Sequence, residues 1–298
     1  MLNQIILKSV GLMPKSLVYT FAKKYIAGEF LSDATKVTKD FEKMGGRTTI
    51  DVLGEFVTSK ERANHEKEMS KEVLKAILDN NLPTYLSIKP TSLGLGIDFD
   101  FGFKNISEVI KIANENNIFV RLDMENSPYT TMTLDIYKKL RSEGLDNCGV
   151  VLQAYMKRSF EDLKDLVKLN PSIRLCKGIY TEDSSIAYKE KEEIRNNYKK
   201  LLQFMFDNGV KTHIATHDDP LIDYADDLIS KNSIEKDRYE FQMLLGVREY
   251  RRNEILSKGH NMRIYVPFGE DWYGYSIRRL NENPQMAGHI FKSLFSRK

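Results

Sequence analysis

This chain contains very little cysteine, with only Cys148 and Cys176 among 298 residues. Two cysteines are too few for a disulfide framework, and neither lies in a CxxC or other metal-ligand spacing. Cys176 lies inside a strand-like run. The scarcity of cysteine therefore predicts a protein of the reducing cytosol that holds no structural metal.

Long apolar runs are also missing. The opening stretch MLNQIILKSVGLMPK is interrupted by Lys8 and is followed by no A-x-A cleavage pattern, which argues against a signal peptide. No run approaches the length of a membrane span. Apolar residues from Leu2 to Met13 recur at helical spacing, so we expect an arm that packs on its own domain. A peripheral helix on a membrane surface is the alternative.

An excess of one charge sign is absent as well. The 45 basic and 42 acidic residues leave a net charge of +3, and the signs are mixed in runs such as KEKEE at 189–193. A nucleic-acid-binding protein would carry a basic stripe or patch, which is not visible. Nucleic acid is therefore excluded as an expected partner.

The motifs of several enzyme classes are missing too. The sequence contains no GxSxG, no HExxH and no cluster of metal-ligand spacing among its five histidines. Hydrolysis by a serine nucleophile and metal catalysis are therefore disfavoured, and we expect no metal site.

Strand-like and helix-like segments alternate through most of the chain. After a helical arm at 1–45, eight strands are predicted at 47–53, 84–89, 118–123, 149–154, 172–176, 211–216, 239–243 and 262–266. Eight βα units of this length predict an α/β fold, a (βα)₈ TIM-type barrel formed as a single domain over 1–298. A doubly wound sheet is the alternative, although its GxGxxG turn is absent and SLGLG at 92–96 is a weak match.

Polar residues recur where the predicted strands give way to loops. They are Lys89, Asp123, Gln153, Arg174, Lys177, Thr216, His217 and Gln242. In a barrel these positions converge on one rim, where active sites form. A packed interior alone requires only apolar layers, so the recurrence predicts a functional site.

The last helix carries a face suited to a carboxylate ligand. Tyr275, Arg278, Arg279 and Glu282 are spaced i, i+3, i+4 and i+7, so they share one side of a helix. Each guanidinium can bind two carboxylate oxygens at once. The preceding MRIYVPFG at 262–269 reads as a strand that leads into this helix, which predicts a C-terminal substrate-binding helix.

The strand MRIYVPFG followed by YxxRRxxE resembles the closing strand and helix of the proline dehydrogenase family. Other blocks match in the same order: DVLGE at 51–55, YLSIKPTSLG at 85–94, VRLDMENS at 120–127, GVVLQAYMKR at 149–158, IRLCKGIY at 173–180, HIATHD at 213–218 and YEFQMLLG at 239–246. The resemblance implies oxidation of L-proline to 1-pyrroline-5-carboxylate, with hydride transfer from Cδ to N5 of FAD.

The resemblance also implies roles for residues around the substrate. The basic residues expected to hold the carboxylate are Lys89, Arg278 and Arg279. The residues expected to enclose the pyrrolidine ring are Leu244, Tyr265 and Tyr275. Asp123 and Tyr180 complete the expected pocket, and Glu55 is expected to pair with Arg278 as a lid latch.

A second set of residues is implied to bind FAD. Arg174 corresponds to the arginine that reaches flavin N5, where negative charge accumulates on reduction. The others are Met124 and Gln153 near the isoalloxazine, and Lys177, Gly178, Ile179, Thr216 and His217 along the rest of the cofactor.

The chain departs from the family pattern at a few positions. Asp218 stands where asparagine is frequent, and Thr181 and Leu245 replace an aromatic residue and a histidine. Asp218 is therefore expected to weaken or redirect FAD binding. Tyr265 stands where relatives that prefer hydroxyproline carry a smaller residue, which predicts a preference for proline.

Two other functions stay open at this level. Lys89 and Lys177 at strand ends are compatible with a Schiff-base aldolase. A flavin-binding regulator is the non-enzymatic alternative. For the enzyme, the resemblance implies a membrane quinone as electron acceptor, with oxygen as the alternative, and pyrroline-5-carboxylate dehydrogenase as a partner.

Overall fold

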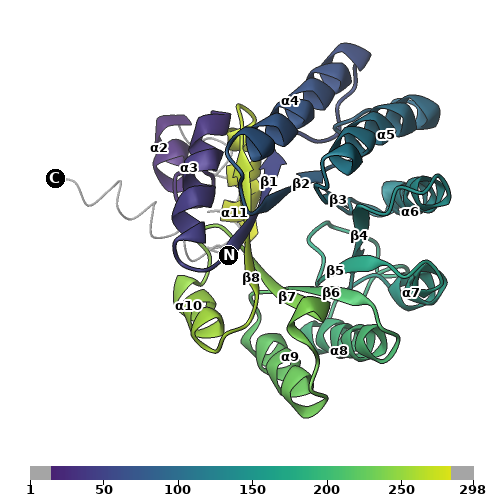
Figure 1. Ribbon diagram of the computed structural model, residues 1–298. Coiled ribbons are helices and arrows are strands. Elements are labelled where there is room, and N and C mark those ends of the chain that lie inside the picture. The colour runs from purple at the N-terminus through teal and green to yellow at the C-terminus, as the bar shows by residue number, and fades with distance from the viewer. Residues whose placement is uncertain (1–14, 283–298) are drawn as a thin grey trace, which may run out of the picture.

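The fold is a closed barrel of eight parallel strands in chain order (Figure 1), as given by a computed structural model that describes residues 15–282. The strands are β1 (Arg47–Val52), β2 (Thr84–Ile88), β3 (Val120–Leu122), β4 (Cys148–Gln153), β5 (Ser172–Cys176), β6 (Lys211–Ala215), β7 (Tyr239–Leu244) and β8 (Met262–Phe268). The barrel closes because β1 pairs with β8 as well as with β2. The predicted barrel is confirmed, and the doubly wound sheet is wrong.

Helices form the outer ring in Figure 1 and cover the sheet. They are α3 (Leu31–Glu42), α4 (Lys60–Asp79), α5 (Phe99–Glu115), α6 (Ser127–Ser142), α7 (Ser159–Val167), α8 (Lys191–Asp207), α9 (Asp219–Lys231) and α10 (Glu249–Ser257), with a short 3₁₀ turn η1 (Lys236–Arg238) before β7. The layer between sheet and helices is apolar and fully buried, as at Leu86, Val120 and Ile214. This continuous layer excludes water from the space between the helices and the strands.

Local sequence signals set the limits of these helices. The Ser59 side chain accepts a hydrogen bond from the Arg62 backbone at the start of α4, and Asp98 does the same for α5. Asn81 and Asn117 follow the ends of α4 and α5 with φ of 46° and 55°. Asparagine tolerates this left-handed conformation, so the chain leaves each helix and turns back toward the next strand.

The interior of the barrel is polar. Arg121 of β3 contacts His213 of β6, and Arg174 of β5 contacts Tyr85 of β2. These pairs come from strands that are not neighbours in the sheet, so their side chains cross the barrel. Barrel interiors are commonly filled by branched apolar residues, and charged groups there require partners.

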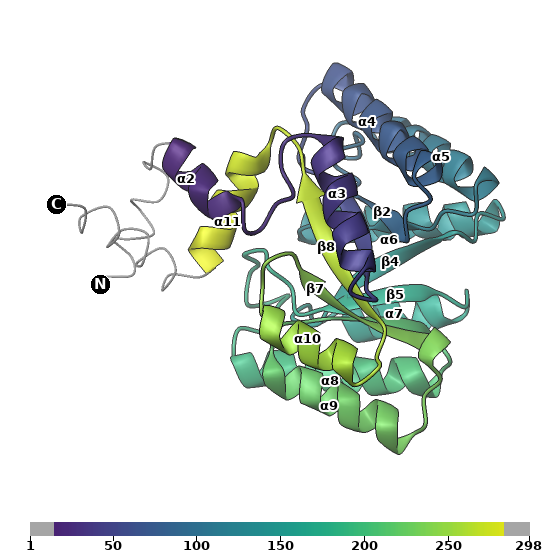
Figure 2. The same cartoon turned by 60° about the vertical axis from the view of Figure 1, so that its left-hand side comes forward.

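Two helices lie beside the barrel ring rather than in it. Figure 2 shows α2 (Lys15–Ala22) packed against α11 (Trp272–Glu282) next to the end of β8. The ring of Tyr19 meets Trp272 edge to face at 4.9 Å between centroids. Trp272 Nε1 also donates to Glu29 Oε1 at 2.7 Å. The described part of the N-terminal arm thus supports the helix that carries the double-arginine motif.

Some expectations concern residues outside the described range. The apolar positions from Leu2 to Met13 lie outside residues 15–282, as does the chain beyond Glu282. The single domain over 1–298 with an arm at 1–45 therefore stays a prediction. Within the described residues, no helix is both long and apolar enough to cross a membrane.

Candidate active site

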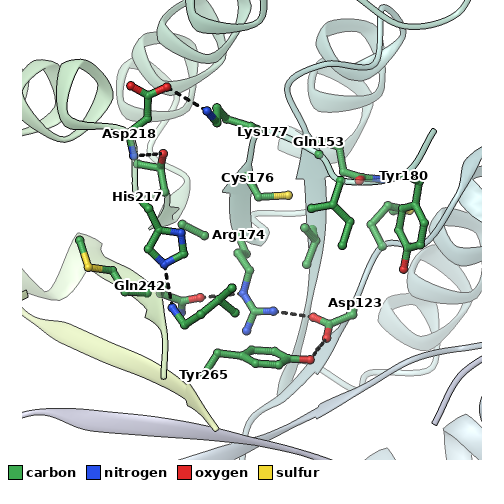
Figure 3. Close-up of a pocket in the computed structure, with 18 of the residues that line it drawn as sticks. Asp123, Gln153, Arg174, Cys176, Lys177, Tyr180, His217, Asp218, Gln242 and Tyr265 are labelled. Atoms are coloured by element: carbon green, nitrogen blue, oxygen red, sulfur yellow. Dashed lines mark hydrogen bonds and ion pairs between the residues drawn. The ribbon is translucent and has the colours of Figure 1, made fainter. Parts of the chain in front are cut away.

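A cavity of about 760 Å³ opens at the carboxyl ends of the strands. Sixteen of the predicted site residues line it: Glu55, Lys89, Asp123, Met124, Gln153, Arg174, Lys177, Gly178, Ile179, Tyr180, Thr216, His217, Gln242, Leu244, Tyr265 and Tyr275. They come from strands and loops all around the barrel, and Figure 3 shows labelled members such as Asp123, Arg174 and Tyr265 around one space. The cavity has the size and the mixed lining of a small-molecule site.

The floor of the cavity is a fixed arginine. Arg174 Nη1 pairs with Asp123 Oδ1, and Arg174 Nε donates to Gln242 Oε1 at 2.6 Å (Figure 3). Burial disfavours the guanidinium cation, but Asp123 and the phenols of Tyr85 and Tyr265 outweigh burial and raise the pKa of Arg174. The side chain therefore stays charged and holds one orientation. Arg174 and Gln242 lie inside β5 and β7 rather than at their ends, which corrects their predicted position.

Tyr265 connects this arginine to a second cation. Its hydroxyl donates to Asp123 Oδ2 at 2.7 Å and lies 3.4 Å from Lys89 Nζ. The Arg174 guanidinium also stacks over the Tyr265 ring, 5.3 Å from its centroid. Tyr265 is thus held at both its face and its hydroxyl, so its ring forms a rigid wall of the cavity.

Lys89 forms an ion pair with Asp51, which was not predicted from the sequence as a site residue. Lys89 Nζ lies 2.6 and 2.7 Å from the two carboxylate oxygens of Asp51. Burial raises the pKa of Asp51 to about 6 against the pull of Lys89, and Asp123 adds to the rise. Burial opposes the charge of Lys89, yet Asp51 and Asp123 raise its pKa, so Lys89 keeps its proton. Asp123, expected in the same pocket, acts on Lys89 as a nearby charge, but the ion-pair partner of Lys89 is Asp51.

The outer end of the cavity is basic. Lys177 Nζ donates to Asp218 Oδ2 at 2.9 Å, and Arg195 Nη2 donates to Asp218 Oδ1 at 2.7 Å. Burial raises the pKa of Asp218, but these hydrogen bonds outweigh it and lower the pKa to about 2. Lys191 and Arg248 line the same end. Two cations thus offset the charge of Asp218, the residue that was expected from the sequence to weaken or redirect FAD binding.

Hydrogen bonds also hold the residues along the cavity wall. Gln153 Nε2 donates to the Glu125 carbonyl at 2.9 Å, and the Leu244 backbone donates to His217 Nε2 at 3.0 Å. The Thr216 hydroxyl accepts from the Asp218 backbone at 3.2 Å. Met124 is buried among them, whereas Ile179 is 52% exposed at the mouth. Most of this wall is therefore ordered without a ligand, which lowers the entropic cost of binding one.

Aromatic side chains close one side of the mouth. The ring of Phe56 lies 6.4 Å from Tyr180 and 6.0 Å from Tyr129, measured between centroids. Phe56 has a φ of 53°, which is uncommon for a bulky residue. Glu55 precedes it and lines the cavity, so the β1–α4 loop contributes an acidic group to the lining and an aromatic ring that packs against Tyr180.

The double-arginine helix reaches the cavity through Tyr275, which is buried and lines it. The side chains of Arg278, Arg279 and Glu282 lie outside the part of the structure that is described. Their expected contacts with substrate and with Glu55 therefore stay predictions.

Several lining residues escaped the sequence analysis. They are Val151, Cys176, Lys191, Arg195, Ala215, Asp219, Pro220, Met243 and Arg248. Arg195 was hidden in the mixed charge run that follows KEKEE, which reads as a solvated helix face. Burial raises the pKa of the Cys176 thiol to about 12, so it is not a reactive thiolate. Among residues 15–282, no group of three or more His, Cys, Asp or Glu side chains could hold a metal ion.

Comparisons with known proteins agree with this geometry. A family model described as proline dehydrogenase matches residues 34–291. Proline dehydrogenase 2 of Bacillus subtilis is 40% identical over 92% of this chain and 90% of its own length. Proline dehydrogenase of Deinococcus radiodurans is 32% identical over 95% and 92%. The structure of proline utilization A from Bdellovibrio bacteriovorus, inactivated by N-propargylglycine, aligns with a TM-score of 0.84 at 26% identity, covering 89% of this chain and 33% of that one.

Proposed function

The chain belongs to the proline dehydrogenase family of flavin-dependent oxidoreductases, and we propose that it oxidises L-proline to 1-pyrroline-5-carboxylate with FAD as the hydride acceptor. One observation carries this proposal. A single cavity joins a fixed arginine and a protonated lysine on its floor to a cluster of cations at its outer end. Such a cavity suits a small anionic substrate and a long phosphate-bearing cofactor together.

Lys89 is suited to bind the carboxylate of proline without losing its internal partner. An ammonium group has three hydrogen-bond donors, and the two Asp51 oxygens accept two of them. One donor stays available on the cavity side. We assign Arg278 and Arg279 as the other two cations of this clamp, since three charge-assisted contacts in a water-poor site bind one anion strongly.

The walls of the substrate pocket are assigned to three apolar or aromatic side chains. They are Leu244, Tyr265 and Tyr275. Asp123 accepts from both Tyr265 and Arg174, so it positions a wall and a cation with one carboxylate. We propose that Tyr180 closes the pocket from the mouth, and that Glu55 and Arg278 form a latch between the β1–α4 loop and α11.

The residues of the outer cavity fit FAD by their chemistry. The lining includes the cations Lys177, Lys191, Arg195 and Arg248 and the carboxylates of Asp218 and Asp219, which leaves an excess of positive charge for a pyrophosphate. We assign Gly178, Ile179, Thr216 and His217 to this end, and Met124 and Gln153 to the isoalloxazine end. When bound, FAD supplies a hydride acceptor at N5.

Arg174 is assigned to the redox end of the cofactor. Asp123 and Gln242 hold its guanidinium in place before any ligand arrives, so little reorganisation accompanies the reaction. A fixed cation stabilises negative charge that develops next to it in a low-dielectric site. We therefore propose that Arg174 raises the reduction potential of the bound flavin.

The protonated state of Lys89 argues against the aldolase alternative. A Schiff-base lysine must lose its proton before it attacks a carbonyl, and such lysines have depressed pKa values. Asp51 and Asp123 instead raise the pKa of Lys89. Proline oxidation, which needs a cation at this position, is the better match.

The fate of the electrons and the product is proposed from relatives. Bifunctional protein PutA of Escherichia coli is 27% identical over 88% of this chain, which makes up 23% of that protein. We propose a membrane quinone as electron acceptor, reached from the cytoplasm by peripheral contact with the membrane. Pyrroline-5-carboxylate dehydrogenase is the proposed partner that consumes the product.

A visible spectrum under anaerobic conditions tests the proposal. The purified protein is expected to show the absorption of oxidised flavin, and L-proline should bleach it. D-proline and glycine serve as controls. D-proline presents its carboxylate and ring in the mirror-image arrangement, and glycine has no ring. A colourless protein, or a flavin spectrum that L-proline leaves unchanged, would contradict the assignment.

A further inference from the structure

The opposite mouth of the barrel contains a second cavity that the proposed oxidation does not use. Its volume is about 430 Å³, and it opens at the amino ends of the strands. The residues that line it are Arg47, Tyr85, Phe119, Ser172, Lys211, His213, Lys236, Asp237, Tyr239, Glu240, Asn261 and Arg263. It shares no lining residue with the larger cavity.

In the described part of the barrel, three of four interior cations pair with a carboxylate. Lys89 pairs with Asp51, Arg174 with Asp123, and Arg263 with Glu240. Arg121 is fully buried, yet no carboxylate among the described residues lies within 4 Å of it. A buried charge without a counter-charge is costly, so the excess at Arg121 requires an explanation.

Arg121 lies directly behind the lining of the second cavity. Its Nη2 donates to Ser172 Oγ at 3.0 Å and contacts His213 Nδ1 at 3.1 Å. Its guanidinium also stacks over Phe119, 4.8 Å from the ring centroid. All three partners line the cavity. Arg121 Nε is buried without a hydrogen-bond partner among the described residues. The positive field of Arg121 therefore acts on this cavity at short range.

The rim of the same cavity adds more unpaired positive charge. Arg47, Lys211 and Lys236 have no carboxylate within 4 Å in the described part of the chain, although many of its surface lysines and arginines do. Asp237 is the acidic residue on this rim, and it too forms no ion pair there. Glu240 is deeper and is already engaged by Arg263.

We propose that the amino-terminal mouth of the barrel binds a phosphoryl dianion, either inorganic phosphate or the phosphate of a small monoester. Lys211, Lys236 and Arg47 meet the anion from the rim, and Ser172 offers a hydroxyl from the floor, with Arg121 behind it. The two negative charges of the anion balance the positive charge of Arg121 and part of the positive charge of the rim residues. The cavity has room for a phosphate that carries a small organic group.

Calorimetric titration of the flavin-bound enzyme tests this proposal. Inorganic phosphate and glycerol 3-phosphate are the two probes, and sodium chloride of equal ionic strength controls for screening. Both probes should give saturable heat. Tighter binding of glycerol 3-phosphate would identify a phosphorylated metabolite as the ligand, and equal binding would identify free phosphate.

A matched pair of double variants locates the binding. Lys211→Ala with Lys236→Ala should weaken phosphate binding at least tenfold, because two charge-assisted contacts are lost. Lys75→Ala with Lys104→Ala removes the same charge from exposed positions on α4 and α5 and should leave binding unchanged. The absence of saturable heat, or equal weakening by both pairs, would overturn the proposal. Binding is read without turnover, so the result does not depend on the proposed oxidation.

Discussion

The two mouths of the barrel use buried charge in different ways. At the carboxyl mouth, Lys89 and Arg174 each have a carboxylate partner that fixes the cation and leaves it available to a ligand. At the amino mouth, Arg263 is paired, whereas Arg121 and the rim cations have no carboxylate within 4 Å among residues 15–282. Both ends come from the same eight strands. The comparison teaches that the carboxyl mouth is organised before binding, while the amino mouth has a charge excess that a ligand would balance.

Removing the fixed arginine should have the largest effect on the carboxyl mouth. Arg174→Met is expected to slow flavin reduction by about 10²–10³-fold, the loss typical for a preorganised electrostatic group, and to lower the flavin potential. Stopped-flow reduction by L-proline and a redox titration measure both.

Arg263→Met is the matched control for Arg174→Met, because it removes a paired buried arginine from the other mouth. It should destabilise the fold but leave the reduction rate of folded enzyme near that of the wild type. Equal slowing of flavin reduction by the two variants would show that the two mouths do not differ in their effect on the reaction.

The acid dependence of stability should come partly from the amino mouth. Burial lowers the pKa of His213 from 6.5 to about 4, and Arg121 adds to this against the pull of Glu240. Between these pH values the unfolded chain binds more protons than the folded chain, so stability is lost as the pH falls. The free energy of unfolding of His213→Gln should therefore fall by about 3 kcal/mol less than that of the wild type between pH 7 and 4. Urea unfolding over this pH range measures the difference.

Exposed His65 on α4 provides the control for His213. His65→Gln should leave the acid slope unchanged. Asp51 at the carboxyl mouth acts in the opposite direction, because its pKa of about 6 lies above the ordinary 3.8, so its contribution to stability is lost as the pH rises. An unchanged acid slope in His213→Gln would show that His213 does not resist protonation.

The carboxylate clamp is the next test of the carboxyl mouth. Arg279→Met should raise the proline KM at least tenfold while FAD stays bound, since losing a charge-assisted contact costs about 1.5–3 kcal/mol. Arg279→Lys keeps the charge and should lose less. Steady-state kinetics with flavin content as a parallel readout distinguish the cases. Unchanged proline kinetics would remove Arg279 from the clamp.

Substrate choice offers a narrower test at the same mouth. Tyr265→Ser opens space near the ring but removes apolar contact and the hydrogen bond to Asp123. Efficiency with proline should fall while efficiency with hydroxyproline holds or rises, a discrimination of about 1–3 kcal/mol. The ratio of the two kcat/KM values is the measurement. An equal fall for both substrates would make Tyr265 a general support rather than a selector.

The smallest expected effect comes from the amino-mouth rim. Lys211→Ala with Lys236→Ala should leave kcat/KM for proline within about 0.5 kcal/mol of the wild type, because these side chains line only the second cavity. A large change in proline kinetics without added phosphate would mean that the two mouths are coupled through the barrel interior.

The prediction from sequence was strongest for the strands and for the rim at their carboxyl ends. Runs of β-branched and apolar residues located all eight strands, and polar residues after strands such as 84–88 and 120–122 marked one end of the barrel. Arg174 and Gln242 lie within their strands and not at the strand ends. Their side chains line the cavity because they point into the barrel. A parallel strand buried on both faces has no alternation that reveals which residues point inward.

By itself, the sequence determined the barrel and its order of elements, because periodicity is a local property, and its resemblance to a known family indicated most of the residues that line the larger cavity. Tertiary structure alone decided which charges meet. Asp51 reaches Lys89 because β1 pairs with β2 in a register that aligns Asp51 with Ser87. Within the described residues Arg121 has no carboxylate partner, because the side chains that its guanidinium meets are those of Ser172 and His213. Ion pairing depends on distances between strands far apart in the chain, which no local pattern encodes.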